Sequence, residues 1–241
     1  MRRFNNYDLA GQPPVLAWNP IAMRCNPVGD GCRNCWHLRM ADRLSRNHCL
    51  PPTVRMAYEG GEVEALESFT ATPPLGRVIA VQFMGDLWHK EVPQSYRDCI
   101  ISRIRKCPGS VFLLLTKRLG RVNERIPDNA WLGTSAWDNS SLSNAMRDLS
   151  TLTHLARHMW LSVEPLIDRI WAIPLMPSHL EFVAVGPETI GGHEGITAFT
   201  ESFVSFWDCY LWGSSVVLYD KRKNWIARDW PAAWKNLKKG I

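Results

Sequence analysis

The stretch Trp18–Leu44, WNPIAMRCNPVGDGCRNCWHLRMADRL, contains three of the seven cysteines of the chain. Cys25, Cys32 and Cys35 have the spacing C-x6-C-x2-C. They follow an apolar run that is typical of a strand, and they lead into a segment with helical periodicity. We therefore expect all three thiols on the loop that joins the first strand to the first helix, where Gly29 and Gly31 permit a tight backbone.

The same alternation of strand and helix continues along the chain. Short runs rich in β-branched or aromatic residues predict strands at Val15–Trp18, Val78–Phe83, Val111–Thr116, Ala130–Thr134, His158–Val163, Phe182–Gly186 and Val216–Tyr219. Segments with apolar stripes predict helices at Cys32–Asn47, Gln94–Lys106, Ser140–Leu152 and Thr200–Trp212. This order of elements predicts an α/β fold with a parallel sheet, in one domain spanning residues 1–241.

Two segments depart from this alternation. Pro52–Thr72 contains Glu59-Gly60-Gly61 between two apolar runs, which predicts an inserted β-hairpin. The C-terminal extension, about residues 220–241, is rich in Lys and Arg, with Trp225, Trp230 and Trp234 interleaved. Such a tail could follow a phosphate backbone, or it could be an amphipathic helix that packs its rings on the rest of the protein.

Composition limits the classes of protein. Apolar residues make up 46% of the chain and charged residues 21%, which is typical of a folded protein. The sequence has neither an apolar stretch long enough to span a bilayer nor a signal peptide, so we expect a cytoplasmic protein that does not bind membranes. A net charge of +5 and 12 tryptophans favour a nucleic-acid partner.

Cysteines in a reducing compartment act as ligands, nucleophiles or buried apolar residues rather than as disulfides. A structural zinc ion needs four ligands, and a fourth would have to come from His37, His48 or Cys49, none at the usual paired spacing. An iron–sulfur cluster with three thiolates leaves one iron open for a substrate or cofactor. Three interpretations remain: a catalytic iron–sulfur cluster, a structural zinc site, and buried core cysteines that happen to lie close together. The iron–sulfur cluster explains the three thiols most economically.

A series of motifs resembles, in order, a phage-associated radical S-adenosylmethionine (SAM) family of unassigned function. The resemblance covers about residues 15 to 190. Its motifs are Trp18-Asn19-Pro20, the three cysteines, Asp86-Leu87-Trp88-His89, Leu115-Thr116-Lys117-Arg118, Trp131-Leu132-Gly133-Thr134-Ser135, Leu161-Ser162-Val163-Glu164-Pro165-Leu166 and Val185-Gly186. The spacing between the first two cysteines is longer than the common C-x3-C-x2-C, and Asn34 stands where an aromatic residue is usual.

The resemblance implies a partial (β/α)6 barrel in which Cys25, Cys32 and Cys35 hold a 4Fe–4S cluster and SAM binds the fourth iron. Reductive cleavage of SAM would give a 5′-deoxyadenosyl radical that takes a hydrogen atom from the substrate. Phage association implies a modified nucleic-acid base as substrate, with isomerisation of a hypermodified thymine in phage DNA as the leading reaction. The alternatives are a lyase of the thymine-dimer type and a non-catalytic, zinc-stabilised DNA-binding module.

Polar residues at strand ends supply candidates for binding SAM. We expect Asp86, Lys117, Ser135 and Glu164 to form this set, because the ribose, carboxylate and ammonium groups of SAM need such partners. Cys209 is a candidate for a thiol that returns a hydrogen atom, whereas Cys99 and Cys107 are expected in the core. The resemblance also implies an electron donor, such as a host flavodoxin or ferredoxin, in the host cytoplasm.

Overall fold

The computed structural model describes residues 2–3, 15–33, 35–168, 170–172, 174–187, 217–220, 225–226 and 237. Its strands are β1 (Arg2–Arg3), β2 (Leu16–Trp18), β3 (Ile21–Ala22), β4 (Glu64–Ala65), β5 (Val78–Val81), β6 (Val111–Leu115), β7 (Ala130–Ala136), β8 (His158–Leu166), β9 (Leu180–Pro187), β10 (Val217–Asp220) and β11 (Trp225–Ile226). Its α-helices are α1 (Trp36–Ser45), α2 (Pro52–Glu59), α3 (Gln94–Arg105) and α4 (Asn139–Thr151).

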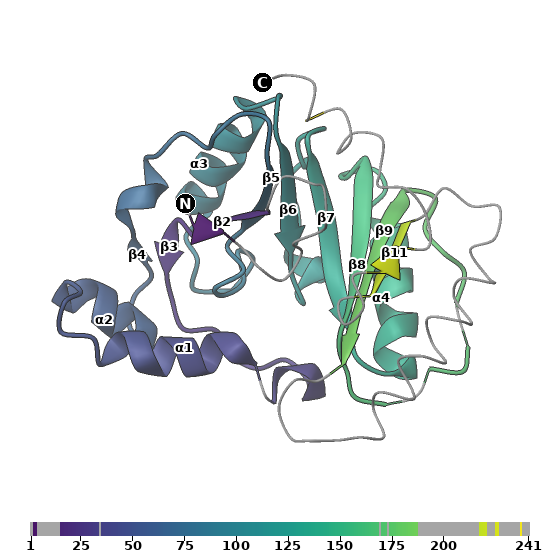
Figure 1. Cartoon of the computed structure of the whole chain (residues 1–241), viewed down its shortest axis with the longest axis horizontal. Helices are drawn as coiled ribbons and strands as arrows, with labels where there is room; N and C mark the ends of the chain where they lie inside the picture. Colours follow the sequence, from purple (N-terminus) through teal and green to yellow (C-terminus); the bar gives the residue numbers. More distant parts are fainter. Residues whose placement is uncertain are drawn as a thin grey trace.

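The main sheet has the strand order β1-β2-β5-β6-β7-β8-β9-β10-β11 (Figure 1). Strands β2 and β5 to β10 are parallel to one another and follow the chain order, and the antiparallel β1 and β11 lie at the edges. A separate antiparallel pair joins β3 to β4. The predicted α/β class with a parallel sheet is confirmed, and the carboxyl ends of the parallel strands meet at one edge.

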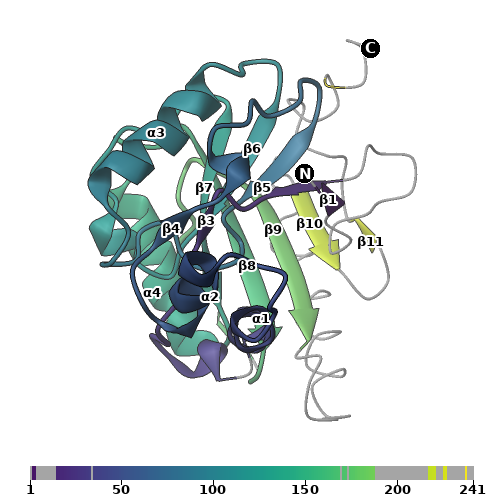
Figure 2. The same cartoon turned by 90° about the vertical axis from the view of Figure 1, so that its left-hand side faces the viewer.

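Alternate residues of the strands point to opposite faces of the sheet. On one face, Ile79 and Phe112 belong to a core that includes Ile100 and Ile104 of α3. Figure 2 shows α3 and α4 together on this side. On the other face, a second core contains Val78, Leu113, Trp131, Trp160 and Phe182, and Leu237 of the C-terminal segment packs against it. The central strands are thus buried on both faces, as is usual for parallel sheets.

The predicted hairpin at Pro52–Thr72 is wrong. Its first half is α2, which buries Val54, Ala57 and Tyr58 at helical spacing. Gly60 has φ 115° and is the left-handed C-cap of this helix, a conformation that favours glycine. The Gly-Gly pair therefore ends a helix rather than turning a hairpin, and β4 pairs with β3 instead of with a strand of its own segment.

The predicted strands all have counterparts within a few residues, as do the first three predicted helices. The helix predicted at Thr200–Trp212, including Cys209, lies outside the described residues, and so does most of the basic tail. None of the helices in the described part of the chain is long and apolar enough to cross a membrane.

Candidate functional site

The three clustered cysteines lie on the loop between β3 and α1, which we call the cysteine loop (residues 23–35). A single 3-10 turn at Asp30–Cys32 tightens the loop, with the Cys32 amide donating to the Gly29 carbonyl oxygen at 2.9 Å. Cys35 is the residue that caps the start of α1. All three thiols are free; Cys32 is buried, and Cys25 and Cys35 are half-buried. The thiols were expected on the loop that joins the first strand to the first helix; in the structure this connection also contains β3, and the cysteines lie between β3 and α1.

The glycines of the cysteine loop rest on the ring of Trp137. A Cβ at Gly31 would lie 2.5 Å from this ring, and one at Gly29 would lie 2.7 Å from it. Both distances are too short for any side chain, so the sequence needs glycine here because of a close approach. Trp137 follows β7, and this contact therefore fixes the cysteine loop against the carboxyl edge of the sheet.

The backbone of Trp137 is held on both sides. Its amide donates to the Ser141 hydroxyl at 2.8 Å, in the capping box of Asp138 and Ser141 that begins α4. Its carbonyl accepts from the Ile167 amide at 2.9 Å, just after β8. The ring that supports the cysteine loop is thus anchored to α4 and to the end of β8.

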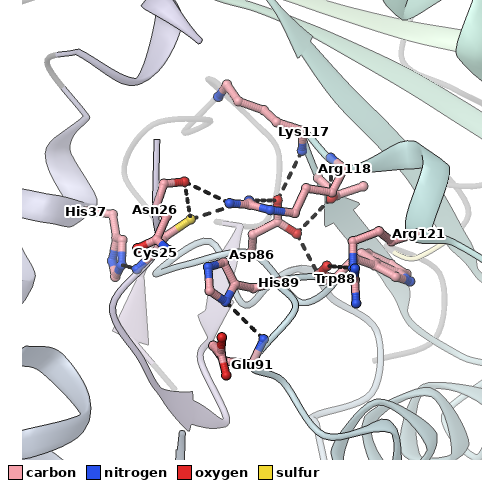
Figure 3. Close-up of polar contacts among 11 residues, drawn as sticks. Cys25, Asn26, His37, Asp86, Trp88, His89, Glu91, Lys117, Arg118 and Arg121 are labelled. Atoms are coloured by element: carbon pink, nitrogen blue, oxygen red, sulfur yellow. Dashed lines mark hydrogen bonds and ion pairs between the residues drawn. The ribbon is translucent and has the colours of Figure 1, made fainter. Parts of the chain in front are cut away.

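Arg118 lies in the segment that follows β6 and contacts the cysteine loop from there. Its guanidinium donates to the Cys25 Sγ at 3.5 Å and to the Asn26 carbonyl oxygen at 2.7 Å (Figure 3). The same group donates to the Asp86 carboxylate at 2.8 Å, and both side chains of this ion pair are nearly buried. One arginine therefore links the first cysteine of the loop to the ends of β5 and β6.

The Asp86 carboxylate is fully engaged within the chain. It accepts from the Thr116 hydroxyl at 2.7 Å, from the amides of Trp88 and Lys117 at 3.0 and 3.2 Å, and from Arg118. A carboxylate offers about four lone-pair sites, and these four donors use them. Asp86 thus holds the segment after β6 and orients Arg118.

Two charges compete at the Cys25 thiol. Burial raises the pKa of Cys25, and the nearby Asp86 carboxylate adds to this effect. The Arg118 guanidinium opposes the rise in pKa through its charge and its hydrogen bond. Arg118 is therefore the group that favours a thiolate at this position.

His37 supports Cys25 from the α1 side. Its Nε2 accepts from the Cys25 amide at 3.4 Å, which assigns the proton of the neutral ring to Nδ1. Nδ1 is buried and has no hydrogen-bond partner in the described part of the chain. Burial lowers the pKa of His37 to about 4, and the Arg24 charge acts in the same direction.

The other predicted cofactor residues lie around the same edge of the sheet. Ser135 of β7 and Ser162 of β8 are direct neighbours in register and are both buried. Glu164 lies two residues beyond Ser162 and is half-buried. The Lys117 side chain extends away from the Asp86 carboxylate (Figure 3). The structure thus brings Asp86 to the cysteine loop through Arg118, and it shows no contact that joins Lys117, Ser135 or Glu164 to Cys25 among the described residues.

Three residues that support the cysteine loop were not among the predicted site residues. Arg118 belongs to one of the ordered motifs and follows a predicted strand, but it is not in the predicted SAM-binding set; His37 is predicted only as a possible zinc ligand. The sequence contains one indication of the contact with Trp137. The glycines at positions 29 and 31 leave room for a bulky side chain to pack against the loop. The position of Trp137 after β7, far along the chain, gives no local sign of that contact.

The donor set of the site is three thiols from one loop. In the part of the chain that the structure describes, no group of three or more His, Cys, Asp or Glu side chains is arranged to hold a metal ion. Thiolates are the soft ligands that iron–sulfur clusters and zinc require. Three thiolates are a donor set that suits a cluster with one open iron. Among the described residues, however, Cys25, Cys32 and Cys35 are not themselves drawn together into a metal-binding group.

Comparison with known proteins adds one finding. A family model described as a protein of unknown function (DUF5131) matches residues 15–198, which include the three cysteines, Asp86, Arg118 and Trp137. No curated protein and no solved structure matches the chain. Because the family match extends from β2 past the end of β9, the chain belongs to the DUF5131 family of unknown function.

Proposed function

We propose that this protein is a radical SAM enzyme that modifies a nucleic-acid base. The observation that carries the proposal is the position of three free cysteines on one loop at the carboxyl edge of a parallel α/β sheet. Enzymes built on such sheets place their chemistry at this edge. The spacing of the thiols, together with the ordered motifs that follow them, favours a catalytic cluster over a structural metal.

The proposed architecture is a partial (β/α)6 barrel. Its support is the strand order, because β2 and β5 to β10 follow the chain order without reversing direction across the sheet. Doubly wound sheets reverse their order at a switch point, whereas barrels do not. The edges of this sheet carry β1 and β11, which fits a barrel that does not close.

Cys25, Cys32 and Cys35 would hold the 4Fe–4S cluster. With three thiolate ligands, the cluster would leave one iron open for SAM, whose one-electron cleavage supplies a 5′-deoxyadenosyl radical for hydrogen abstraction. Arg118 would keep the Cys25 sulfur hydrogen-bonded and partly shielded from water. Trp137 would hold the Gly29–Gly31 segment against the sheet.

Ser135 and Glu164 are the proposed contacts for SAM on β7 and β8, and Lys117 is proposed to supply a positive charge for it. Asp86 is proposed to act mainly through Arg118, since its carboxylate already accepts four hydrogen bonds. The proposed substrate is a hypermodified thymine in phage DNA, and the reaction an isomerisation. The net charge of +5 and the tryptophan content support a nucleic-acid substrate. A host flavodoxin or ferredoxin would supply the electron in the host cytoplasm.

Cluster loading tests the proposal. The full chain, purified without oxygen, is expected to be brown and to hold about four irons and four sulfides per chain. Cys25→Ala, Cys32→Ala and Cys35→Ala are each expected to lose the visible absorbance. Cys49→Ala is the matched control, because Cys49 is exposed and lies outside the cysteine loop.

A colourless wild-type protein that binds one zinc ion and unfolds when the zinc is removed would overturn the proposal. In that case the cysteine loop would be a structural zinc site. Loss of colour in the Cys49→Ala control alone would also contradict the assignment of the ligands.

A further inference from the structure

Helix α1 begins directly after Cys35, and one side of it is basic. Trp36, Arg39, Arg43 and Arg46 are all exposed, with Trp36 at 41%. At 100° per residue, the spacings of three, four and three place these side chains in one stripe along the helix. The buried residues of α1, His37, Ala41 and Ser45, lie on a different side. We call the four exposed residues the α1 stripe.

The charge of the α1 stripe is not neutralised by its neighbours. Arg39 and Arg43 make no hydrogen bond or ion pair with any residue that the structure describes. Asp42 is the only acid within α1, and it pairs with Arg24 at 2.6 Å. The Arg46 Nε donates to a backbone oxygen of the helix, which leaves the charge of the side chain in place. The stripe therefore presents an uncompensated positive surface to solvent.

The dimensions of the α1 stripe suit a phosphate backbone. With a rise of about 1.5 Å per residue, neighbouring members of the stripe stand about 4.5 to 6 Å apart along the helix axis. Long arginine side chains can adjust this spacing to successive phosphates of one strand. Trp36 adds an exposed ring at the end nearest the cysteines, and such rings stack on unpaired bases.

We infer that the α1 stripe binds the phosphate backbone of the nucleic-acid substrate and directs one base toward the cysteine loop. This inference rests on the proposed function, because it takes a nucleic acid as the substrate. Arg39 and Arg43 contact phosphates, and Trp36 stacks on a base next to the site. An acidic redox protein is the competing partner for a basic surface; we favour the nucleic acid because the exposed Trp36 ring can also stack on an unpaired base.

The test is DNA binding by the full chain, measured by fluorescence anisotropy with a labelled oligonucleotide, single-stranded and as a duplex. Arg39→Gln/Arg43→Gln is expected to weaken binding about tenfold and to lower the slope of log K against log salt by about 1.4 to 1.8. Trp36→Ala is expected to weaken single-strand binding more than duplex binding, because only unpaired bases are free to stack.

The matched control is Arg105→Gln/Arg157→Gln. Both arginines are exposed and lie before β6 and β8, at the amino ends of the strands and thus at the opposite edge of the sheet. This control removes the same charge and is expected to keep the salt slope of the wild type. An equal loss of DNA affinity in both double variants would overturn the inference, because binding would then depend on the total charge of the protein rather than on the α1 stripe.

An unchanged DNA affinity in Arg39→Gln/Arg43→Gln would also overturn the inference, and weaker binding of a reduced flavodoxin by that variant would assign the surface to the electron donor. Cluster loading is measured separately, as the iron content of each protein. A variant that keeps its iron content but loses DNA binding supports the inference. A wild-type protein that holds no iron, but whose DNA binding depends on Arg39 and Arg43, would refute the proposed enzymatic function and still support DNA binding by the α1 stripe.

Discussion

The guanidinium of Arg118 lies 3.5 Å from the sulfur of Cys25 and is fixed there by Asp86. These two residues are 93 positions apart in the sequence. Their contact joins the cysteine loop to the carboxyl ends of β5 and β6, where Asp86 and Arg118 follow the strands. Burial has the largest effect on the pKa of Cys25 and raises it, and the contact with Arg118 opposes this rise.

Replacing Arg118 should make Cys25 less reactive. Arg118→Gln removes the charge and the hydrogen bond that oppose the burial-raised pKa of the thiol, so less thiolate forms at a given pH. We expect alkylation of Cys25 by iodoacetamide in the metal-free protein to slow roughly threefold or more. Site-resolved mass spectrometry measures this rate.

Lys117→Gln is the control for Arg118→Gln, since it removes a neighbouring charge whose side chain extends away from Asp86 (Figure 3). Equal slowing in both variants would show that general charge, rather than the contact with Arg118, sets the reactivity of Cys25.

Breaking the ion pair from the other side should destabilise the fold. Asp86→Asn leaves Arg118 nearly buried without its counter-charge, and one-sided loss of a buried pair costs about 3 kcal/mol. Urea unfolding of Asp86→Asn, Arg118→Gln and the double variant forms a double-mutant cycle. We expect the two effects to be strongly non-additive; strictly additive losses would mean that the pair does not act as a unit.

A methyl group under the cysteine loop should disrupt it. Gly31→Ala puts a Cβ 2.5 Å from the Trp137 ring, and such overpacking costs about 1 to 3 kcal/mol. Trp137→Leu in the same chain should restore part of this loss by making room. Gly120→Ala is the control, because a Cβ there has nothing within 4 Å. Thermal unfolding compares the variants, and an equal cost at Gly120 would refute the explanation.

The stability of the metal-free protein should fall as the pH drops from 6.5 to about 4. His37 has an ordinary pKa of 6.5 when unfolded and about 4 when folded. Below pH 6.5 only the unfolded chain gains a proton at this position, so the free energy of unfolding decreases by about 3 kcal/mol until pH 4 and then levels off. The buried His89, whose pKa is also lowered by burial, acts in the same direction.

His37→Gln should flatten this part of the pH profile, measured by urea unfolding at several pH values. His154→Gln is the control, because His154 is exposed, and it should follow the wild-type curve. A His37→Gln protein that still loses the full stability between pH 6.5 and 4 would contradict the role of His37.

The sequence predicted the strands of the sheet well, because buried parallel strands are short apolar runs that stand out from amphipathic helices. Val111–Leu115 is such a run, and it is β6 as predicted. The hairpin predicted at Gly60-Gly61 is wrong because a Gly-Gly pair can end a helix as well as turn a hairpin. Pro52 at the start and buried residues at positions 54, 57 and 58 favour the helix, and this spacing could have decided between the two.

The candidate site was predictable only where its residues are close in the sequence. Cys25, Cys32 and Cys35 form a local pattern, so their loop could be found. The supports of that loop, Arg118 and Trp137, follow β6 and β7, and contacts between residues so far apart in the sequence depend on the packed fold. Asp86 was identified as a strand-end acid, but its four hydrogen-bond partners became visible only in the structure.

The release of 5′-deoxyadenosine tests the central claim most directly. The anaerobically purified full chain is mixed with SAM and dithionite, and the product is measured by chromatography beside a Cys32→Ala variant. The account predicts 5′-deoxyadenosine from the wild type and none above background from Cys32→Ala. A wild-type protein that holds a full iron complement and yet releases no more 5′-deoxyadenosine than this variant would contradict it.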